Sequence, residues 1–225
     1  QSAQNGNSVV VLEVNSEIGG NTVASGGQFQ SAQSYLVWDP ADPDATTGVY
    51  KGVTYNKVHN ATGNIKVLKE ILNWNENEFD SKYFDSTPFV AGDIETLSHA
   101  GVHAEYLGTL KELKSEIQAY LNWAQPQLDA GKAEGEITLF STPNLHIFQT
   151  YYGGLRPNAE KTSWIYGSYD LVKQFVEGGQ YLKGWLEDQG AIFDNSIQPI
   201  IVGALWNREN DFKGSDLDGD GTPDP

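Results

Sequence analysis

The stretch that decides the fold is Ser8 to Gln28, SVVVLEVNSEIGGNTVASGGQ. It opens with four apolar residues, Val9 to Leu12, three of them β-branched, and this predicts a short strand buried on both faces. The strand ends on an acid, Glu13, where nucleotide-binding parallel sheets hold a ribose. Two glycine pairs follow, Gly19-Gly20 and Gly26-Gly27, and glycine lets a backbone approach a ligand closely. The spacing fits a nucleotide site, and it also fits a strand followed by an ordinary glycine-rich turn.

The segment LEVNSEIGGNTVASGG resembles the second-strand segment of the FAD domain in the fumarate reductase / succinate dehydrogenase flavoprotein superfamily. That family, which includes flavocytochrome c-type fumarate reductases and related enoate reductases, has an acid after an apolar strand, then Gly-Gly-Asn and a small-residue Gly-Gly turn. The resemblance implies that Glu13 holds the ribose hydroxyls of the adenosine. It also implies a loop that passes the pyrophosphate and flavin, formed by Gly19, Gly20, Asn21 and Thr22. A turn beside the isoalloxazine would be formed by Ser25, Gly26 and Gly27.

In the family, a strand–turn–helix unit carrying Gly-x-Gly-x-x-Gly comes before this strand and holds the pyrophosphate at a helix N-terminus. Here only seven residues, QSAQNGN, precede Ser8, and no Gly-x-Gly-x-x-Gly occurs in the sequence. We therefore expect an incomplete FAD domain, an internal piece of a flavoprotein. Such a piece needs the missing segments of its own parent chain, or a partner subunit, to complete the site.

Two later segments, NLHIFQTYYGG and YDLVKQFVEGGQYLKGWLEDQGAIFD, resemble helical family segments that follow the flavin loop. In relatives they come soon after the Gly-Gly turn, whereas here more than a hundred residues separate Gly27 from Leu145. The implied fold is α/β, a Rossmann-like FAD-binding portion with a large, mostly helical insertion. The expected organisation is a partial FAD-binding segment, the insertion, a helical segment leading to a substrate-capping domain, and an acidic Asp/Gly tail, at 1–34, 35–135, 136–212 and 213–225.

Apolar residues at helical spacing predict helices over 64–74 and 106–130, the second ended or kinked by Pro126 and stopped by Gly131. Pro143 is well placed in the first turn of a helix running to Gly154. The remaining expectations are a pair of helices over 168–190 interrupted by Gly178-Gly179, short helices over 28–37 and 93–101, loops over 39–48 and 75–86, and a strand or extended connector over 50–59.

The totals exclude several classes of function. A net charge of −16 and only two arginines argue against nucleic acid or an anionic membrane as partner. The sequence contains no run of eighteen apolar residues, so no membrane span is predicted. The absence of cysteine excludes disulfides, thiolate catalysis, cysteine-ligated zinc and iron–sulfur clusters. Neither this nor the absence of a signal-peptide pattern distinguishes a cytoplasmic from an extracytoplasmic location.

Other candidates for chemistry are few. Arg208, in WNREND, lies in a stretch reminiscent of a family segment near the substrate pocket, but its acidic neighbours Glu209 and Asp211 favour a surface ion pair. His99 and His103 are four residues apart, without the glutamate of a metalloprotease helix, so solvated or hydrogen-bonded histidines are expected. In the tail SDLDGDGTPDP, alternating carboxylates followed by a glycine match the first half of an EF-hand calcium loop and equally fit a linker; these are Asp216, Asp218, Asp220 and Gly221.

Two functions fit the sequence. The first, implied by the resemblance, is part of an FAD-dependent oxidoreductase that reduces the activated alkene of a small unsaturated carboxylate, with the chain inactive alone and its catalytic residues unassigned. FAD chemistry needs the protein to place the substrate carboxylate with cationic donors. The second is a non-catalytic, acidic helical binding module that holds calcium, with abundant aromatic residues suited to a carbohydrate or peptide surface.

Overall fold

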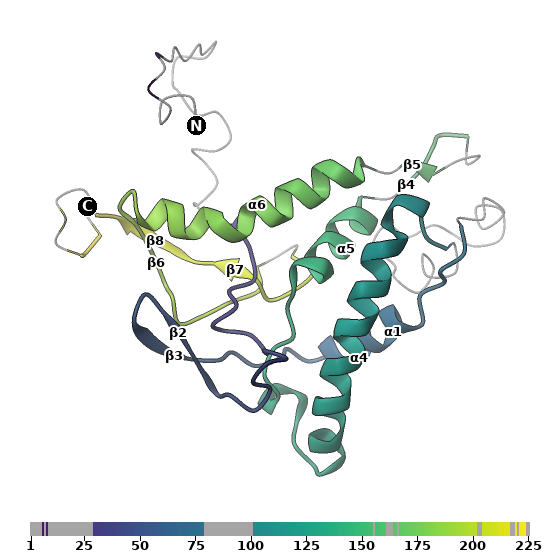
Figure 1. Cartoon of the computed structure of the whole chain (residues 1–225), viewed down its shortest axis with the longest axis horizontal. Helices are drawn as coiled ribbons and strands as arrows, with labels where there is room; N and C mark the ends of the chain where they lie inside the picture. Colours follow the sequence, from purple (N-terminus) through teal and green to yellow (C-terminus); the bar gives the residue numbers. More distant parts are fainter. Residues whose placement is uncertain are drawn as a thin grey trace.

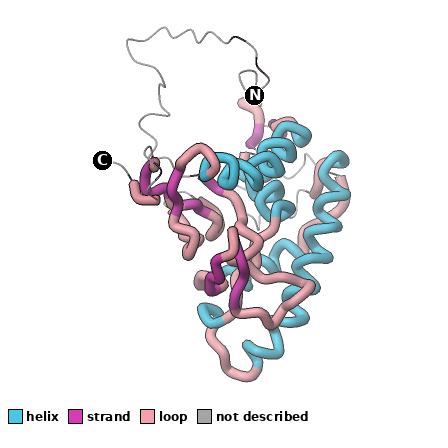
Figure 2. Tube along the Cα trace, turned by 60° about the vertical axis from the view of Figure 1, so that its left-hand side comes forward, coloured by secondary structure: helices cyan, strands magenta, loops and turns pink. Residues whose placement is uncertain are grey.

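The computed structural model describes Gly6, Ser8 and the ranges 29–78, 101–154, 156–160, 164–165, 167–201, 204–216, 219 and 221–223. Within these ranges helices and small antiparallel sheets are mixed, so the expectation of an α and β chain is confirmed (Figures 1 and 2). The strand expected at 9–12, the helix expected at 93–101 and most of the loop expected at 75–86 lie outside the described residues.

Four α-helices form the larger part of the described structure: α1 (Asn64–Leu72), α4 (Leu107–Asp129), α5 (Pro143–Gly153) and α6 (Tyr169–Glu187). The 3₁₀ turns η2 (Ala104–Tyr106) and η3 (Glu134–Glu136) lie on either side of α4. The helices predicted around α1, α4 and α5 are confirmed. In α5, the Thr142 side chain caps the first turn by accepting a hydrogen bond from the Leu145 amide, and Pro143 takes the first helical position. Pro126 lies inside the last turn of α4, which ends before Gly131 at φ 98°.

The core lies where α1, α4 and α5 meet. The apolar stripe of α4 is buried there, with Leu110, Leu113 and Ile117 fully covered. Aromatic side chains fill the space toward α5: the Trp74 and Phe148 ring centroids are 4.9 Å apart, and those of Tyr106 and Tyr151 are 5.4 Å apart. The helices of the 35–135 and 136–212 regions therefore share one core.

The prediction of two helices over 168–190 is wrong. The structure has one uninterrupted helix, α6, that runs through Gly178 and Gly179. Each glycine costs about 1 kcal/mol relative to alanine in a helix interior. Packing offsets this cost, because Val176 and Lys183 are buried on the side of α6 that faces α5 and β6. In Figure 1, α6 runs across the top of the molecule above the strands at its left end.

The strands are short and pair in antiparallel twos. The hairpin of β2 (Thr47–Tyr50) and β3 (Val53–Asn56) turns at Lys51 and Gly52, both at positive φ, which partly confirms the extended segment expected at 50–59. The other pairs are β1 (Phe29–Gln30) with β7 (Glu209–Asn210), β4 (Arg156–Pro157) with β5 (Trp164–Ile165), and β6 (Ala191–Phe193) with β8 (Phe212–Ser215). No Rossmann-like parallel sheet is found among the described residues.

The prediction of a helix over 28–37 is wrong, because the described residues of this range form β1 and a turn at 34–36. Here long-range pairing overrides local propensity: the Ser31 amide donates to the Arg208 carbonyl at 2.9 Å. The loop expected over 39–48 is confirmed up to Thr47, where β2 begins. Among the described residues, no helix is both long enough and apolar enough to cross a bilayer.

Candidate functional site

All eight residues expected to bind flavin lie outside the described residues, so their role stays a prediction; they are Glu13, Gly19, Gly20, Asn21, Thr22, Ser25, Gly26 and Gly27. The chain that follows them is described from Phe29, two residues after Gly27. The structure therefore shows how the chain continues after the glycine-rich segment, and the residues around this continuation form the candidate site.

The segment that follows the glycines is held by a buried polar network. The Ser31 hydroxyl accepts hydrogen bonds from the side-chain amides of Gln33 and Asn210, at 2.9 and 3.1 Å. Gln198 donates to the Ser31 carbonyl at 2.8 Å and accepts from the Gln33 amide at 3.1 Å. These four side chains are at most 7 % exposed. The network fixes the chain leaving the glycine-rich segment against the 198–210 segment.

The same network brings Arg208 to the site. The prediction that Arg208 forms an ion pair at the surface is wrong. Arg208 is 1 % exposed, and its guanidinium Nη2 donates to the side-chain oxygen of Gln149 on α5. Its Nε has no hydrogen-bond partner among the described residues. Arg208 also forms no ion pair with any of them. Because Glu209 and Asp211 are close in sequence but form no such pair with Arg208, the guanidinium is a buried cation without a carboxylate in the part of the chain that the structure describes.

Burial controls the charges around Arg208. It lowers the pKa of Arg208 to about 9, so the guanidinium is still protonated at pH 7. Burial, and then the charge of Arg208, lower the pKa of His146 to about 3, so this imidazole is neutral. Burial, and then Asp211, raise the pKa of the Glu209 carboxyl. The site therefore holds one positive charge on Arg208 beside a neutral histidine.

A buried guanidinium without a carboxylate has the donors to bind an anion with two parallel hydrogen bonds. Moving a charge out of water costs several kcal/mol unless an opposite charge compensates it. A ligand carboxylate would supply that compensation, and the neutral His146, whose Nδ1 has no partner among the described residues, could add a hydrogen bond. Arg208, His146 and Gln149 are therefore the candidate anion-binding residues.

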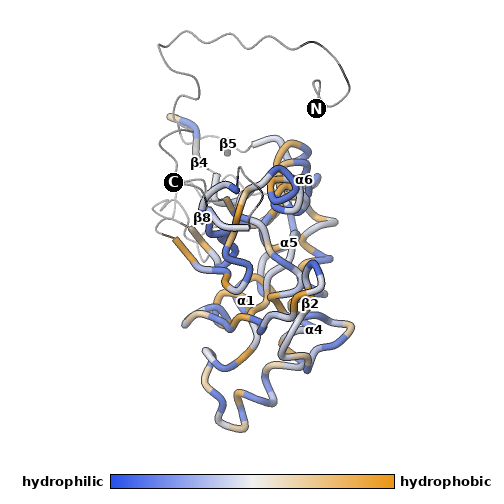
Figure 3. Tube along the Cα trace, turned by 90° about the vertical axis from the view of Figure 1, so that its left-hand side faces the viewer, coloured by the Kyte–Doolittle hydropathy of each residue, from blue (hydrophilic) through white to orange (hydrophobic). Residues whose placement is uncertain are grey.

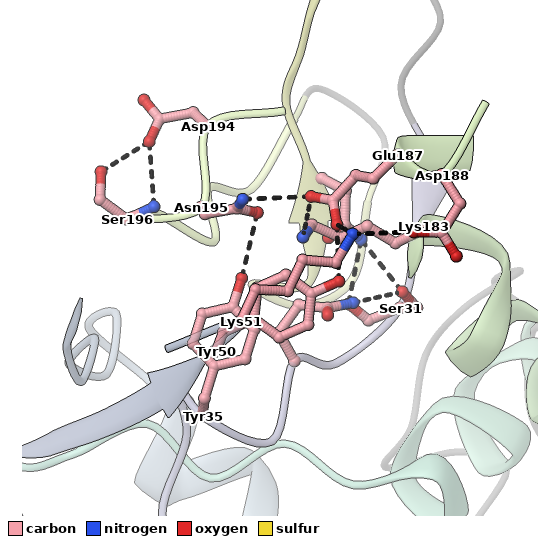
Figure 4. A network of polar contacts seen from close by, with 12 residues as sticks. Ser31, Tyr35, Tyr50, Lys51, Lys183, Glu187, Asp188, Asp194, Asn195 and Ser196 are labelled. Carbon is pink, nitrogen blue, oxygen red and sulfur yellow. Dashed lines mark hydrogen bonds and ion pairs between the residues drawn. The ribbon is translucent and has the colours of Figure 1, made fainter. Parts of the chain in front are cut away.

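A second polar cluster surrounds Glu187 at the end of α6 (Figure 4). One carboxylate oxygen accepts from the Lys183 ammonium at 2.8 Å and from the Asn195 amide at 3.1 Å. The other accepts from the Tyr50 hydroxyl at 2.6 Å and lies 3.1 Å from the Lys51 ammonium. Burial alone would raise the pKa of Glu187, but these donors together lower it to about 2.

The Glu187 cluster is a structural connection rather than a reactive site. The Lys183 ammonium lies 4.3 Å from the centre of the Tyr50 ring, which stacks on Tyr35 with centroids 4.6 Å apart. The Lys183 side chain is 2 % exposed, and burial lowers its pKa even though Glu187 acts in the opposite direction. Since Tyr50, Lys51 and Asn195 all donate to the Glu187 carboxylate, the cluster holds the β2–β3 hairpin and the 194–196 loop against α6.

The tail is described only in part. Asp216 follows β8, and its two carboxylate oxygens accept hydrogen bonds from the amides of Gly219 and Gly221, at 2.6 and 2.9 Å. Asp218 and Asp220 lie outside the described residues, and no group of three metal-ligating side chains is found within them. His99 is also outside, while His103 precedes η2 rather than lying on a longer helix. The calcium loop stays a prediction.

A cavity of about 250 Å³ borders the segment that follows β1. Its lining includes Ala32, Trp38, Ser141 and Gln180, from three separate parts of the chain. The volume is below the roughly 300–1,000 Å³ typical of small-molecule sites, so this cavity is too small for a dinucleotide cofactor.

Sequence reasoning missed His146 and Gln149 as site residues, and it missed the structural Lys183–Glu187 pair. His146 and Gln149 lie three positions apart, on one side of α5, which was a usable signal. The i, i+4 spacing of Lys183 and Glu187 was another. Neither signal identifies the partner, because Gln149 is 59 positions from Arg208 and Tyr50 is 137 positions from Glu187.

Comparison with known proteins shows that the chain is similar to part of an enzyme. The chain is 32 % identical over 204 residues to an enzyme named NADH:acrylate oxidoreductase, from Vibrio harveyi. The match covers 90 % of this chain but only 15 % of that protein, so the chain spans a small part of its relative. No family model matches the chain, and no solved structure matches it. The chain is thus similar to part of a large oxidoreductase.

Proposed function

We propose that this chain is part of an FAD-dependent oxidoreductase that reduces the activated alkene of an α,β-unsaturated carboxylate. The observation that carries the proposal is the 32 % identity to NADH:acrylate oxidoreductase across 90 % of the chain. An acrylate is such a carboxylate, and the relative's name thus agrees in substrate class with the resemblance of the glycine-rich segment to fumarate reductases. The flavin, when bound, supplies the electrons for the reduction.

The described residues fit a carboxylate substrate. Arg208 is a buried cation whose Nε lacks a partner among them, and this is the chemistry needed to orient a small carboxylate. Its backbone carbonyl accepts from the Ser31 amide, so the residue that carries the cation is hydrogen-bonded to the chain four residues after the end of the predicted flavin segment. In this proposal Arg208 binds the substrate carboxylate, Gln149 orients the guanidinium, and Glu13 with the two glycine pairs holds FAD.

Replacing Glu13 with glutamine in the parent protein is expected to weaken FAD binding about 10- to 100-fold. A carboxylate that accepts two ribose hydroxyls makes charge-assisted hydrogen bonds, each worth about 1.5–3 kcal/mol, and an amide makes weaker ones. The measurement is the Kd of FAD from flavin fluorescence quenching after removal of the bound cofactor. Glu17→Gln is the matched control, since Glu17 is an acid in the same segment outside the motif. Equal effects of the two variants, or a parent protein purified without flavin, would contradict the proposal.

The acidic tail gives a prediction that is independent of flavin. If alternating carboxylates at Asp216, Asp218 and Asp220 bind calcium, adding the ion at ten times its Kd should stabilise the chain by about 1.4 kcal/mol. Thermal unfolding with calcium and with magnesium measures this shift. Asp218→Asn should abolish it, whereas Asp129→Asn, at the exposed end of α4, should not. A calcium shift that survives Asp218→Asn would place the ion elsewhere.

A further inference from the structure

The side of α6 that faces away from α5 is apolar and exposed. Leu171, Phe175, Leu182 and Trp185 lie on it and are 67, 70, 39 and 46 % exposed. With Gly178 between them, they repeat at intervals of four, three, four and three residues, which places all five along one line of the helix. We call this line the α6 stripe. Figure 3 shows both hydrophobic (orange) and hydrophilic (blue) residues on α6.

The opposite side of the same helix is also covered with apolar contacts, since Val176 is 1 % exposed and Val172 packs on the core. A helix that is apolar on both sides is normally covered on both sides. Four large apolar side chains in a row, on a chain of net charge −16, are costly to leave in water. The α6 stripe therefore needs an occupant.

The path of the chain points to an occupant. A Cβ built on Gly179, which is next to the stripe, would lie 3.9 Å from the carbonyl oxygen of Gln30. β1 therefore lies beside the middle of α6, and the undescribed chain before it joins the described residues at this point. The chain before β1 contains a run of four aliphatic residues, Val9–Leu12, and residues 1–12 contain no Asp, Glu, Lys or Arg. An extended strand of four residues is about 13 Å long, and the stripe is about 21 Å long.

We infer that the α6 stripe is the packing surface for the apolar segment Val9–Leu12 of the same chain. The sixteen residues between Leu12 and Phe29 can span more than 50 Å, so the tether allows this contact. A short tether gives an effective concentration on the order of 1 mM, far above the micromolar concentration of a second copy. Two copies, each with a net charge of −16 over the whole chain, would also bring Asp170, Glu177 and Asp188 of one stripe close to those of the other. The inference does not depend on flavin.

The natural absence of cysteine makes the test direct, because an introduced pair is the only pair in the chain. The probe position is Gly178→Cys, where a Cβ meets no atom within 4 Å, and it is paired in separate variants with Val9→Cys, Val10→Cys or Val11→Cys. The measurement is the rate of disulfide formation at about 1 µM protein, below the effective concentration that the tether provides. Peptide mass spectrometry then distinguishes bonds within one chain from bonds between chains.

We expect intrachain bonds to form at least tenfold faster with Gly178→Cys than with Gly108→Cys. The control position is also an exposed helical glycine with open space around its Cβ, but it lies on α4. Because alternate strand residues face opposite sides, either Val10→Cys should react fastest, or Val9→Cys and Val11→Cys should. Circular dichroism of each variant shows that the helices are kept.

Three results would overturn the inference: equal rates at the two glycines, bonds only between chains, or no bond in a folded variant. As a second measurement, Phe175→Gln should speed cleavage after Glu13 by a glutamate-specific protease severalfold, and Lys173→Gln should not. A cross-link without flavin binding in the parent protein would support this inference and contradict the proposed function. Flavin binding without the cross-link would support the proposed function and contradict this inference.

Discussion

Replacing Glu187 with glutamine is expected to lower the free energy of unfolding by about 3–5 kcal/mol, the usual cost of removing one partner from a buried ion pair. The change keeps the size of the side chain but removes the charge that faces the Lys183 ammonium. Since Lys183 is 2 % exposed, its ammonium would be left in a low-dielectric environment with the aromatic rings of Tyr35 and Tyr50. Urea unfolding followed by tryptophan fluorescence measures the difference.

The Glu187 cluster also predicts how stability depends on pH. The pKa of Glu187 is about 2 in the folded chain and near 4.5 in the unfolded chain. A carboxyl with a lowered folded pKa contributes stability that is complete above the unfolded pKa and is lost as pH falls through the folded pKa. The wild-type chain should therefore lose this contribution between about pH 4.5 and pH 2. Glu187→Gln should remove that part of the acid sensitivity.

The chain provides a matched control on the same helix. Lys173 and Glu177 form another i, i+4 pair on α6, at 3.8 Å, with both side chains about half exposed. Glu177→Gln should change the free energy of unfolding by less than about 0.5 kcal/mol, because exposed pairs are worth little. Adding Lys183→Met to Glu187→Gln should restore part of the lost stability. Equal effects of Glu177→Gln and Glu187→Gln would show that the cluster does not stabilise the fold.

Much of the fold was predictable where the information is local. The apolar stripe of α4, the Gly131 stop and the Thr142–Pro143 start of α5 are each specified within a few residues, and all three were confirmed. The errors arose where distant contacts decide. Residues 29–36 form a short strand and a turn, and Gln198 and Asn210 hydrogen-bond to the segment between them from more than 160 positions away.

The candidate site was harder to predict, for a related reason. In WNREND the acids next to Arg208 suggested an exposed ion pair, because sequence shows only neighbours along the chain. The fold instead buries the guanidinium against Gln149 of α5. In the same way, Gly178 and Gly179 suggested a helix break, whereas α6 continues through them because its inner side is packed. In both cases burial, which no local pattern displays, decided the outcome.

Arg208 gives the prediction with the largest expected effect on activity. In the parent protein, Arg208→Met is expected to lower kcat/KM for a small unsaturated carboxylate by about 30- to 5,000-fold. Losing one partner of a buried, hydrogen-bonded charge pair costs roughly 2–5 kcal/mol, and each 1.4 kcal/mol is a factor of ten. Arg208→Lys keeps the charge but loses the planar fork, so it should restore only a small part of the activity.

Stability separates this role from a structural one. Burial lowers the pKa of Arg208 to about 9, which means that the folded chain disfavours its charge. Replacing a whole buried ion pair with well-packed apolar side chains is often neutral or stabilising by about 1–4 kcal/mol, and a buried cation without a carboxylate has the same kind of desolvation cost. Arg208→Met should therefore leave the free energy of unfolding unchanged or raised while activity falls. Loss of more than about 2 kcal/mol, with activity lost only in proportion to the unfolded fraction, would make Arg208 a structural residue. A cation that is kept at a cost to folding and compensated only by ligand is what a carboxylate-binding site requires.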